Sequence, residues 1–339
     1  MATAKNGLIM YESGRSLVDF EATTDSGDHK VYNPSGLLMS NREGYEYEIR
    51  PNGVVSGSNM VSPGAADDEI DVASFSGYIA GDLLSFAAET LTVTRGSTDG
   101  YIINSVVAYD NAGSAALKIV AGTESTSFTE ERDVAGGPPL IGADEVEIAQ
   151  VRLTSLTAGA VTESQIYQVP GQHQERYDFP VFDVNPIGMG SNADDPNKVN
   201  AYIEFSDALP TIHTGSATKK VYAKYYIPTF AEFKRALEWT PIEMSHSVSS
   251  SEYYSGAISS VSSSLGQGGF TVYLDDGITD PIIGEKNNTL TFKFFPSKTK
   301  SAYQVSQGIV GLARTFPVGD QIQASVTVSG ENETAEFSG

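Results

Sequence analysis

The apolar residues of this chain occur in short runs that alternate with polar residues and are interrupted by turn-forming residues. This pattern limits the possible folds more than any other feature, because alternation with a period of two suits a strand, whereas a helix needs a period near 3.6. Gly, Ser and Thr are abundant between the runs, as is typical of antiparallel sheets. The sequence therefore predicts a mainly β fold with little helix.

Nine segments are the clearest strand candidates. They are residues 46–49, 90–94, 102–109, 117–121, 146–153, 221–227, 270–274, 289–294 and 322–329. Recognisable turns bound several of them, among them Asp99-Gly100 and Asp276-Gly277, whose residues tolerate the backbone angles of tight turns. The spacing of strands and turns predicts hairpins.

One segment, residues 228–239, instead predicts a helix. Thr229 can cap its start, and Glu232 lies three residues later, as a capping box requires. Three apolar side chains share one helical face: Phe230, Phe233 and Leu237. We expect a single flanking helix that packs this stripe against a sheet, with an anchor for a partner as the alternative.

Residues 66–170 form a strongly acidic block, with sixteen acidic and four basic side chains. Turn-forming residues bound it at 62–64 and at 169–171. A domain can be inserted into a surface loop of another domain when its two ends lie close together. The chain is therefore predicted to have a discontinuous β core, residues 1–65 and 171–339, with a small acidic β domain inserted at 66–170.

The whole chain is acidic as well, with 43 acidic and 21 basic side chains and a formal net charge of -22. Tight binding to a phosphate backbone needs clustered cations, and the nearest approaches to a cluster are Lys219-Lys220, Lys234-Arg235 and the pair Lys298 and Lys300. Nucleic acid is therefore not expected as a tight ligand. An acidic surface can still let DNA pass without binding it, because like charges repel. The alternative is that the acidity only keeps an abundant protein soluble.

Cysteine is absent, so neither a disulfide framework nor a thiolate metal site is possible. The first residues lack the apolar core of a signal peptide, and no uninterrupted apolar run approaches roughly 18 residues. We expect a soluble chain that is made in a cytoplasm and has no membrane partner.

Motifs that carry chemistry are missing from the sequence. The four histidines, at positions 29, 173, 213 and 246, are far apart, and none has a partner at metal-ligand spacing. Residues 188–193 resemble only the start of a dinucleotide-binding fingerprint and lack its last glycine. We expect no catalytic, cofactor-binding or metal site, and no enzymatic activity.

Acidic turns are the remaining candidates for a site. Residues 194–197 and residues 275–277 with Asp280 gather carboxylates, which calcium prefers, but neither fits the twelve-residue calcium loop. Residues 67–69 and 130–131 could supply paired carboxylates for sugar hydrolysis, yet adjacent residues of a strand point to opposite faces. Solvated turns and solubilising patches are the simpler interpretation of all four.

Three segments near the C-terminus resemble the end of the tail tube proteins of long-tailed bacteriophages. They are residues 292–296 (FKFFP), 308–312 (GIVGL) and 318–330 (VGDQIQASVTVSG). The order of an apolar strand, a connecting strand and a closing "GD…SVTVSG" strand recurs in that family, and the resemblance covers roughly the last fifty residues. It implies a tail-tube β-sandwich or barrel flanked by one helix.

The acidic block resembles β modules of phage tail and fibre proteins, in which a strand series leads through a Pro-Pro loop to a further strand. The corresponding residues here are 100–103, 121–123, 138–139 and 144–151. A plain tail tube protein would be shorter, so this insertion departs from the simplest family pattern. Being strongly acidic, it is expected to project from the outside of a tube.

The resemblance to tail tube proteins implies a structural virion protein that assembles in the host bacterial cytoplasm into stacked rings, commonly of six subunits. Edge strands of neighbouring subunits would pair around a lumen through which DNA is ejected. The implied partners are further copies of the chain, the tape measure protein, and the tail terminator and distal tail proteins. Residues 1–10 are one candidate for contacts between rings. A second is residues 50–64, which are expected to form a long polar loop with few core-forming residues. Simple surface disorder is the alternative for both.

Other interpretations remain open at this point. A baseplate ring, a capsid decoration protein or a fibre-attachment protein would share the β composition. A carbohydrate-binding adhesin module is a further alternative. An internal duplication would allow a trimeric ring, but the two halves show no clear repeat.

Overall fold

The structure is a computed structural model that describes residues 6–35, 38–44, 46–57, 60–168, 181–187, 201–209, 211, 220–254 and 256–337. Strands make up 55% of it and helices 2%, and the strands form several antiparallel sheets. Each of the nine segments predicted as strands overlaps a strand. The prediction of a mainly β fold is therefore confirmed.

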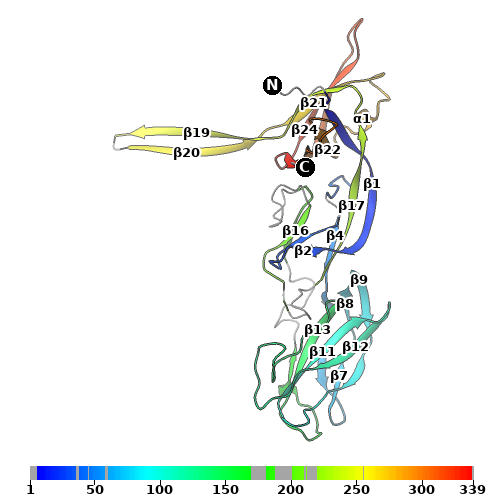
Figure 1. The fold of residues 1–339 in the computed structure, drawn as a ribbon, viewed down its shortest axis with the longest axis vertical. Coiled ribbons are helices and arrows are strands. Elements are labelled where there is room, and N and C mark those ends of the chain that lie inside the picture. Colours follow the sequence, from blue (N-terminus) through cyan, green and yellow to red (C-terminus); the bar gives the residue numbers. More distant parts are fainter. Residues whose placement is uncertain are drawn as a thin grey trace.

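The largest sheet has nine strands and extends from the top of the molecule to its middle in Figure 1, and we call its upper part the body. Its path, in spatial order, is β18 (Ala236–Thr240), β21 (Gly268–Tyr273), β24 (Gln323–Ser329), β23 (Tyr303–Thr315), β22 (Thr289–Phe295), β1 (Leu8–Ala22), β17 (Val221–Glu232) and β4 (Glu48–Pro51), with β25 (Ala335–Phe337) paired to β23. The first strand, β1, and the last, β25, belong to the same sheet, because β1 pairs with β22, β22 with β23, and β23 with β25.

The body core lies under this sheet. Alternate residues of β24 are buried, namely Ala324, Val326 and Val328, and they pack with Phe270 of β21 and Phe292 of β22 in one apolar cluster. The rings of Phe270 and Phe292 meet edge to face with centroids 5.7 Å apart. The period of two that predicted these strands is thus the period of their burial.

The prediction of a helix at residues 228–239 is wrong. Residues 228–232 continue β17 and pair with residues 10–15 of β1, and residues 236–240 form β18, which pairs with β21. The chain turns between these strands at Arg235, whose φ is 63°. The helical pattern extends over little more than two turns, and the backbone hydrogen bonds offered by two neighbouring strands outweigh so weak a local preference.

Strands β1 and β17 are long and run together from the body towards the other end of the molecule (Figure 1). Beside them lies a four-stranded sheet in the order β15 (Phe182–Asn185), β16 (Tyr202–Phe205), β3 (Val31–Asn33) and β2 (Thr24–Asp25). A second apolar cluster joins this sheet to β17, through Tyr32, Phe205 and Tyr225 among others.

The acidic segment, residues 66–170, lies at the far end of the molecule from the body (Figure 1). Its strands and their neighbours form three small sheets: β10 (Glu89–Thr92), β7 (Glu69–Val72) and β6 (Val61–Pro63); β5 (Gly53–Ser56), β8 (Phe75–Ile79) and β9 (Asp82–Phe86); and β12 (Ala115–Ala121), β11 (Ile102–Asp110), β13 (Glu145–Leu153) and β14 (Ile166–Gln168). These sheets share one apolar cluster, which extends from Val54 to Ile166.

Residues 50–64 were predicted as a polar loop with few core residues, and this is wrong for the part that the structure describes. Val54, Met60 and Val61 are almost fully buried in the cluster of the acidic segment. Residues 53–56 and 61–63 form β5 and β6. The shared core therefore begins before residue 66, while the division of the chain into domains at 66 and 170 stays a prediction.

The described residues contain two short helical turns. They are the 3-10 turn η1 (Glu163–Gln165) and the α-helix α1 (Pro281–Gly284). Neither coincides with the predicted flanking helix.

One further pair of strands, β19 (Met244–Tyr253) and β20 (Gly256–Leu265), forms a two-stranded sheet of its own. We call this pair the ribbon. It stands out sideways from the body, across the long axis of the molecule (Figure 1).

Candidate self-assembly surfaces

The ribbon pairs with no other described strand. Its register is regular from Met244 opposite Leu265 to Tyr253 opposite Gly256. An isolated two-stranded hairpin is only marginally stable in water, because it has no third strand and no core to cover a face. Both of its outer edges also carry free backbone donors and acceptors. The ribbon is therefore the most obvious surface for contact with another chain.

The two faces of the ribbon differ in chemistry. On one face, serine hydroxyls bond across the strands at 2.9, 2.7 and 2.8 Å in the pairs Ser245 and Ser264, Ser247 and Ser262, and Ser249 and Ser260. We call this the serine face. On the other face Val248 lies opposite Val261, and these side chains are 70% and 67% exposed. Polar pairs flank them on this face, namely His246 with Ser263 and Ser250 with Ser259. We call this the valine face.

The root of the ribbon is held firmly by the body. Ile242, just before β19, is fully buried, and its backbone N–H donates to the hydroxyl of Thr334 at 2.7 Å. The backbone N–H of Thr334 donates back to the carbonyl of Ile242 at 2.8 Å. Two further bonds close the root, from Gly266 N–H to the carbonyl of Glu243 and from Met244 N–H to a carboxylate oxygen of Glu333. The direction of the ribbon is thus set by the body.

The two end strands of the nine-stranded sheet are short and irregular by comparison. The pairing of β18 with β21 is interrupted after Leu237, and Glu238 has a φ of 61°. At the other end β4 finishes at Pro51, which lacks a backbone donor. Such features normally discourage pairing between sheets. Among the described strands, the ribbon offers longer and more regular free edges than β18 or β4.

The acidic segment uses all of its cations internally. Arg95 pairs with Asp68, Lys118 with Glu145, Arg132 with Glu147 and Arg152 with Glu130. These are the four basic residues of residues 66–170, set against sixteen acidic ones. The surface of this segment therefore repels phosphate and other acidic partners.

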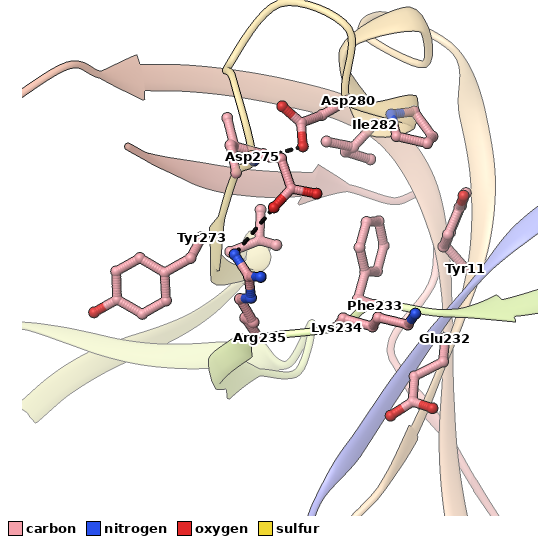
Figure 2. A pocket seen from close by; sticks show the side chains of 12 residues that line it. Tyr11, Glu232, Phe233, Lys234, Arg235, Tyr273, Asp275, Asp280 and Ile282 are labelled. Carbon is pink, nitrogen blue, oxygen red and sulfur yellow. Dashed lines mark hydrogen bonds and ion pairs between the residues drawn. The ribbon is translucent and has the colours of Figure 1, made fainter. Parts of the chain in front are cut away.

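A cavity of about 190 Å³ lies where β17, the turn at Lys234 and Arg235, and β21 meet (Figure 2). Tyr11 and Phe233 stack in it with ring centroids 4.2 Å apart. Its carboxylates already have partners. Glu232 pairs with Lys298, Asp275 pairs with Arg235, and Asp280 accepts three backbone N–H groups. The carboxylates of the cavity are therefore engaged in structural contacts.

The acidic turn at residues 275–280 is held together by its own carboxylates. Asp280 accepts the N–H groups of residues 275–277, and Asp276 accepts those of Ile278 and Thr279. The hydroxyl of Thr279 and these two N–H groups lower the pKa of Asp276 to about 2. The carboxylates thus act as turn caps, and no group of acidic or histidine side chains within the described ranges has the geometry of a metal site.

The other acidic candidates are engaged in structural contacts or lie outside the described residues. Asp68 and Glu130 belong to the ion pairs above, and a carboxylate oxygen of Glu69 accepts the N–H of Ala66 at 3.1 Å. Residues 194–197, and the glycine-rich residues 188–193, are outside the described residues.

Two of the four histidines are described. His29 contacts Asp25 in the turn between β2 and β3, at 2.5 Å, and His246 bonds to Ser263 on the ribbon at 2.9 Å. Positions 173 and 213 are outside the described residues, as are Lys219 and residues 1–5 of the predicted N-terminal contact segment. Residues 8–10 of that segment belong to β1.

One buried and one half-buried ionisable group lie in the body away from these surfaces. Glu12 of β1 is fully buried, bonds to the hydroxyl of Ser40 and accepts the N–H of Thr291, and burial raises its pKa despite these bonds. Lys293 of β22 lies over the rings of Phe230 and Tyr303, at 4.3 and 5.2 Å, and burial lowers its pKa. Glu12 is therefore enclosed by the body, whereas Lys293 is half-buried at its surface.

The sequence did not reveal the ribbon. Serine is not among the residues enriched in strands, and residues 244–265 lack the apolar alternation that marked the other strands. A signal was present nonetheless, because serine recurs at every second position from 245 to 251 and the segment contains Ser255-Gly256 near its middle. The same period of two appears here in hydroxyl rather than apolar side chains.

No helix among the described residues is long and apolar enough to cross a membrane. Comparison with protein-family models, with curated proteins and with solved structures gives no match to this chain. The surfaces above are therefore the basis for any functional assignment.

Proposed function

We propose that this chain is a structural virion protein that self-assembles into stacked rings, forming the tail tube of a long-tailed bacteriophage. The observation that carries the proposal is the ribbon, a regular two-stranded sheet held at its root and paired with no other described strand. A free ribbon of this length is only marginally stable, so a second copy that covers it would stabilise both chains. The resemblance of residues 292–330 to tail tube proteins agrees with this role.

The charge of the chain also supports a tube through which DNA passes. A net charge of -22 and internal pairing of every cation of the acidic segment leave little that could hold a phosphate backbone. A wall made of such subunits repels DNA and does not trap it. We place the acidic segment on the outside of the tube, at the far end of the molecule from the ribbon (Figure 1). Rings of six, and contacts with tape measure, terminator and distal tail proteins, follow from the resemblance.

The test is the assembly state of the purified protein across a range of concentrations, measured by sedimentation velocity and negative-stain electron microscopy. Tubes or rings of uniform width are expected. A monomer at the highest concentration overturns the proposal. Rings that never stack would favour a baseplate or other ring-forming virion component.

A matched control is available at the root of the ribbon. The backbone N–H of Gly266 donates to the carbonyl of Glu243 at 2.9 Å, so the two ends of the ribbon are adjacent. Residues 244–265 can therefore be replaced by an Asn-Gly turn with little effect on the body. This shortened chain is expected to fold, with an unchanged β spectrum, and to remain monomeric.

A further inference from the structure

We infer that the ribbon docks on a second copy of this chain through its valine face and leaves its serine face uncovered. The inference rests on the proposed self-assembly and specifies which side of the ribbon takes part.

The valine face is the side that gains from being covered. Val248 and Val261 lie directly opposite each other, and most of each side chain is exposed. At the root of the same face, Met244 is 41% exposed. Exposed apolar side chains that lie opposite each other on a projection gain from transfer out of water. The described body leaves the valine pair exposed and therefore available to a partner.

The serine face has no such requirement. Its hydroxyls already bond to one another across the strands, in the three pairs between residues 245–249 and 260–264. Along residues 245–249 and 260–264, covering this face would remove hydroxyls from water without removing apolar area, which costs free energy unless the partner supplies matching groups. The apolar residues at register positions of this face, Tyr253 and Ile258, lie nearer the tip of the ribbon. The serine face is therefore expected to stay exposed to water.

Charge favours an identical copy as the occupant. Residues 244–265 contain no Lys or Arg and one carboxylate, Glu252, within a chain of net charge -22. Two copies repel each other over most of their surfaces, and the ribbon is a long projection that can approach another copy almost free of this repulsion.

The size of the ribbon favours a ring, in which the same small contact is repeated between each pair of neighbouring copies. Strands of ten residues extend about 33 Å, and with two strands about 5 Å apart one face covers on the order of 300 Å². A stable interface between two unrelated proteins buries about 800 Å² on each partner. One ribbon face is too small for that, but in a ring each copy gives one ribbon and receives another. Such head-to-tail contacts gain stability when the ring closes.

Single cysteines test the face assignment directly, because the natural chain has none. Val248→Cys and Ser249→Cys place the thiol on adjacent residues of opposite faces, and both positions are exposed in the single chain. Each variant is labelled with a maleimide under reducing conditions, once dilute and once after assembly. We expect assembly to slow the labelling of V248C at least tenfold and that of S249C less than twofold.

Other labelling results would overturn the inference while leaving self-assembly intact. Labelling of both variants that assembly does not slow would mean that the ribbon joins through its edges or remains free. Protection of S249C alone, or of both variants, would mean that the serine face is covered. Failure of the unmodified chain to assemble would instead remove the proposed function, and this inference with it.

A second pair of variants gives an independent readout. Val248→Glu and Ser249→Glu add the same charge on opposite faces. V248E is expected to abolish assembly. S249E is expected to change the protein concentration at which assembly begins by less than about twofold. Equal effects of the two variants would contradict the assignment, because only a face-specific contact separates them.

Discussion

The phenolic hydroxyl of Tyr222 donates a hydrogen bond of 2.7 Å to Oδ1 of Asp144, and this bond joins β17 to the segment that leads into β13. Beside it, the guanidinium of Arg50 lies over the rings of Phe20 and Tyr78, at 3.8 and 4.7 Å. Burial and the neighbouring carboxylate raise the pKa of Tyr222, so its hydroxyl stays protonated and able to donate at neutral pH. The acidic segment is thus attached to β17 by a specific contact as well as by the chain.

Replacing Tyr222 by Phe removes this bond without removing the ring. Tyr222→Phe is expected to lower the free energy of unfolding by about 1–3 kcal/mol, because the lost bond has a charged acceptor. Urea unfolding measures the change, and Asp144→Asn with the double variant completes a mutant cycle. Strictly additive effects of the two substitutions would show that the bond has no coupling energy.

The body and the acidic segment have separate apolar clusters, so their stabilities should respond separately. Phe292 and Ile148 are fully buried, in the body cluster and the acidic-segment cluster respectively. Truncation to Ala at either position is expected to cost about 2–5 kcal/mol. Calorimetry should show one transition lowered by Phe292→Ala and another by Ile148→Ala. A single transition that both substitutions shift equally would contradict this independence.

A buried ion pair inside the acidic segment should matter far more than an exposed one. Glu147 is fully buried and its carboxylate pairs with Arg132. Arg132→Met leaves that charge without its partner and is expected to cost about 3–5 kcal/mol. Lys298→Met breaks the pair with Glu232, in which both side chains are nearly half exposed, and is expected to cost less than about 1 kcal/mol. Equal losses in urea unfolding would refute the ranking.

Glu12 predicts a pH dependence of stability. Its folded pKa is raised above the usual 4.5 by burial, so the folded chain holds the proton more tightly than the unfolded chain does. The contribution of this group to stability is present in full below about 4.5 and is lost as the pH rises through the folded pKa. Glu12→Gln keeps the shape and cannot ionise, so its stability relative to the parent chain should increase as the pH rises above 4.5.

Urea unfolding of both chains from pH 4 to pH 8 measures this difference. Thr291 N–H can donate to the amide oxygen, and the amide NH2 can donate to the hydroxyl oxygen of Ser40, so Gln is a fair replacement. A constant difference across this range would show that Glu12 does not titrate differently in the two states.

The strands that the sequence predicted are those whose burial follows their apolar pattern. In β24 buried and exposed residues alternate through Val326 and Val328, which is the signal that a period of two provides. The helix at residues 228–239 was mispredicted because capping and spacing are local, whereas the competing partners, β1 and β21, lie far away in sequence. Long-range pairing of this kind is not visible in a short window.

The candidate site was predicted less well than the fold. The sequence directed attention to edge strands and to residues 50–64, yet Val54 and Val61 of that segment are core residues. The ribbon was missed because its strands are built from serine, and the pairing of Ser247 with Ser262 needs no apolar side chain. A strand that is held by cross-strand hydroxyls has a hydrogen-bonding signature and lacks the hydrophobic one.

The closed root of the ribbon has a consequence for how such a protein could change. Because Glu243 and Gly266 meet at the base, residues can be added to or removed from the two strands together without rebuilding the fold. Side chains alternate between faces, so a change of one residue in each strand exchanges the outward surfaces of everything beyond it, whereas a change of two restores them. The ribbon can therefore lengthen or shorten in steps of about 7 Å while the same side chains stay on each face. Its length and the chemistry of its faces can thus change independently.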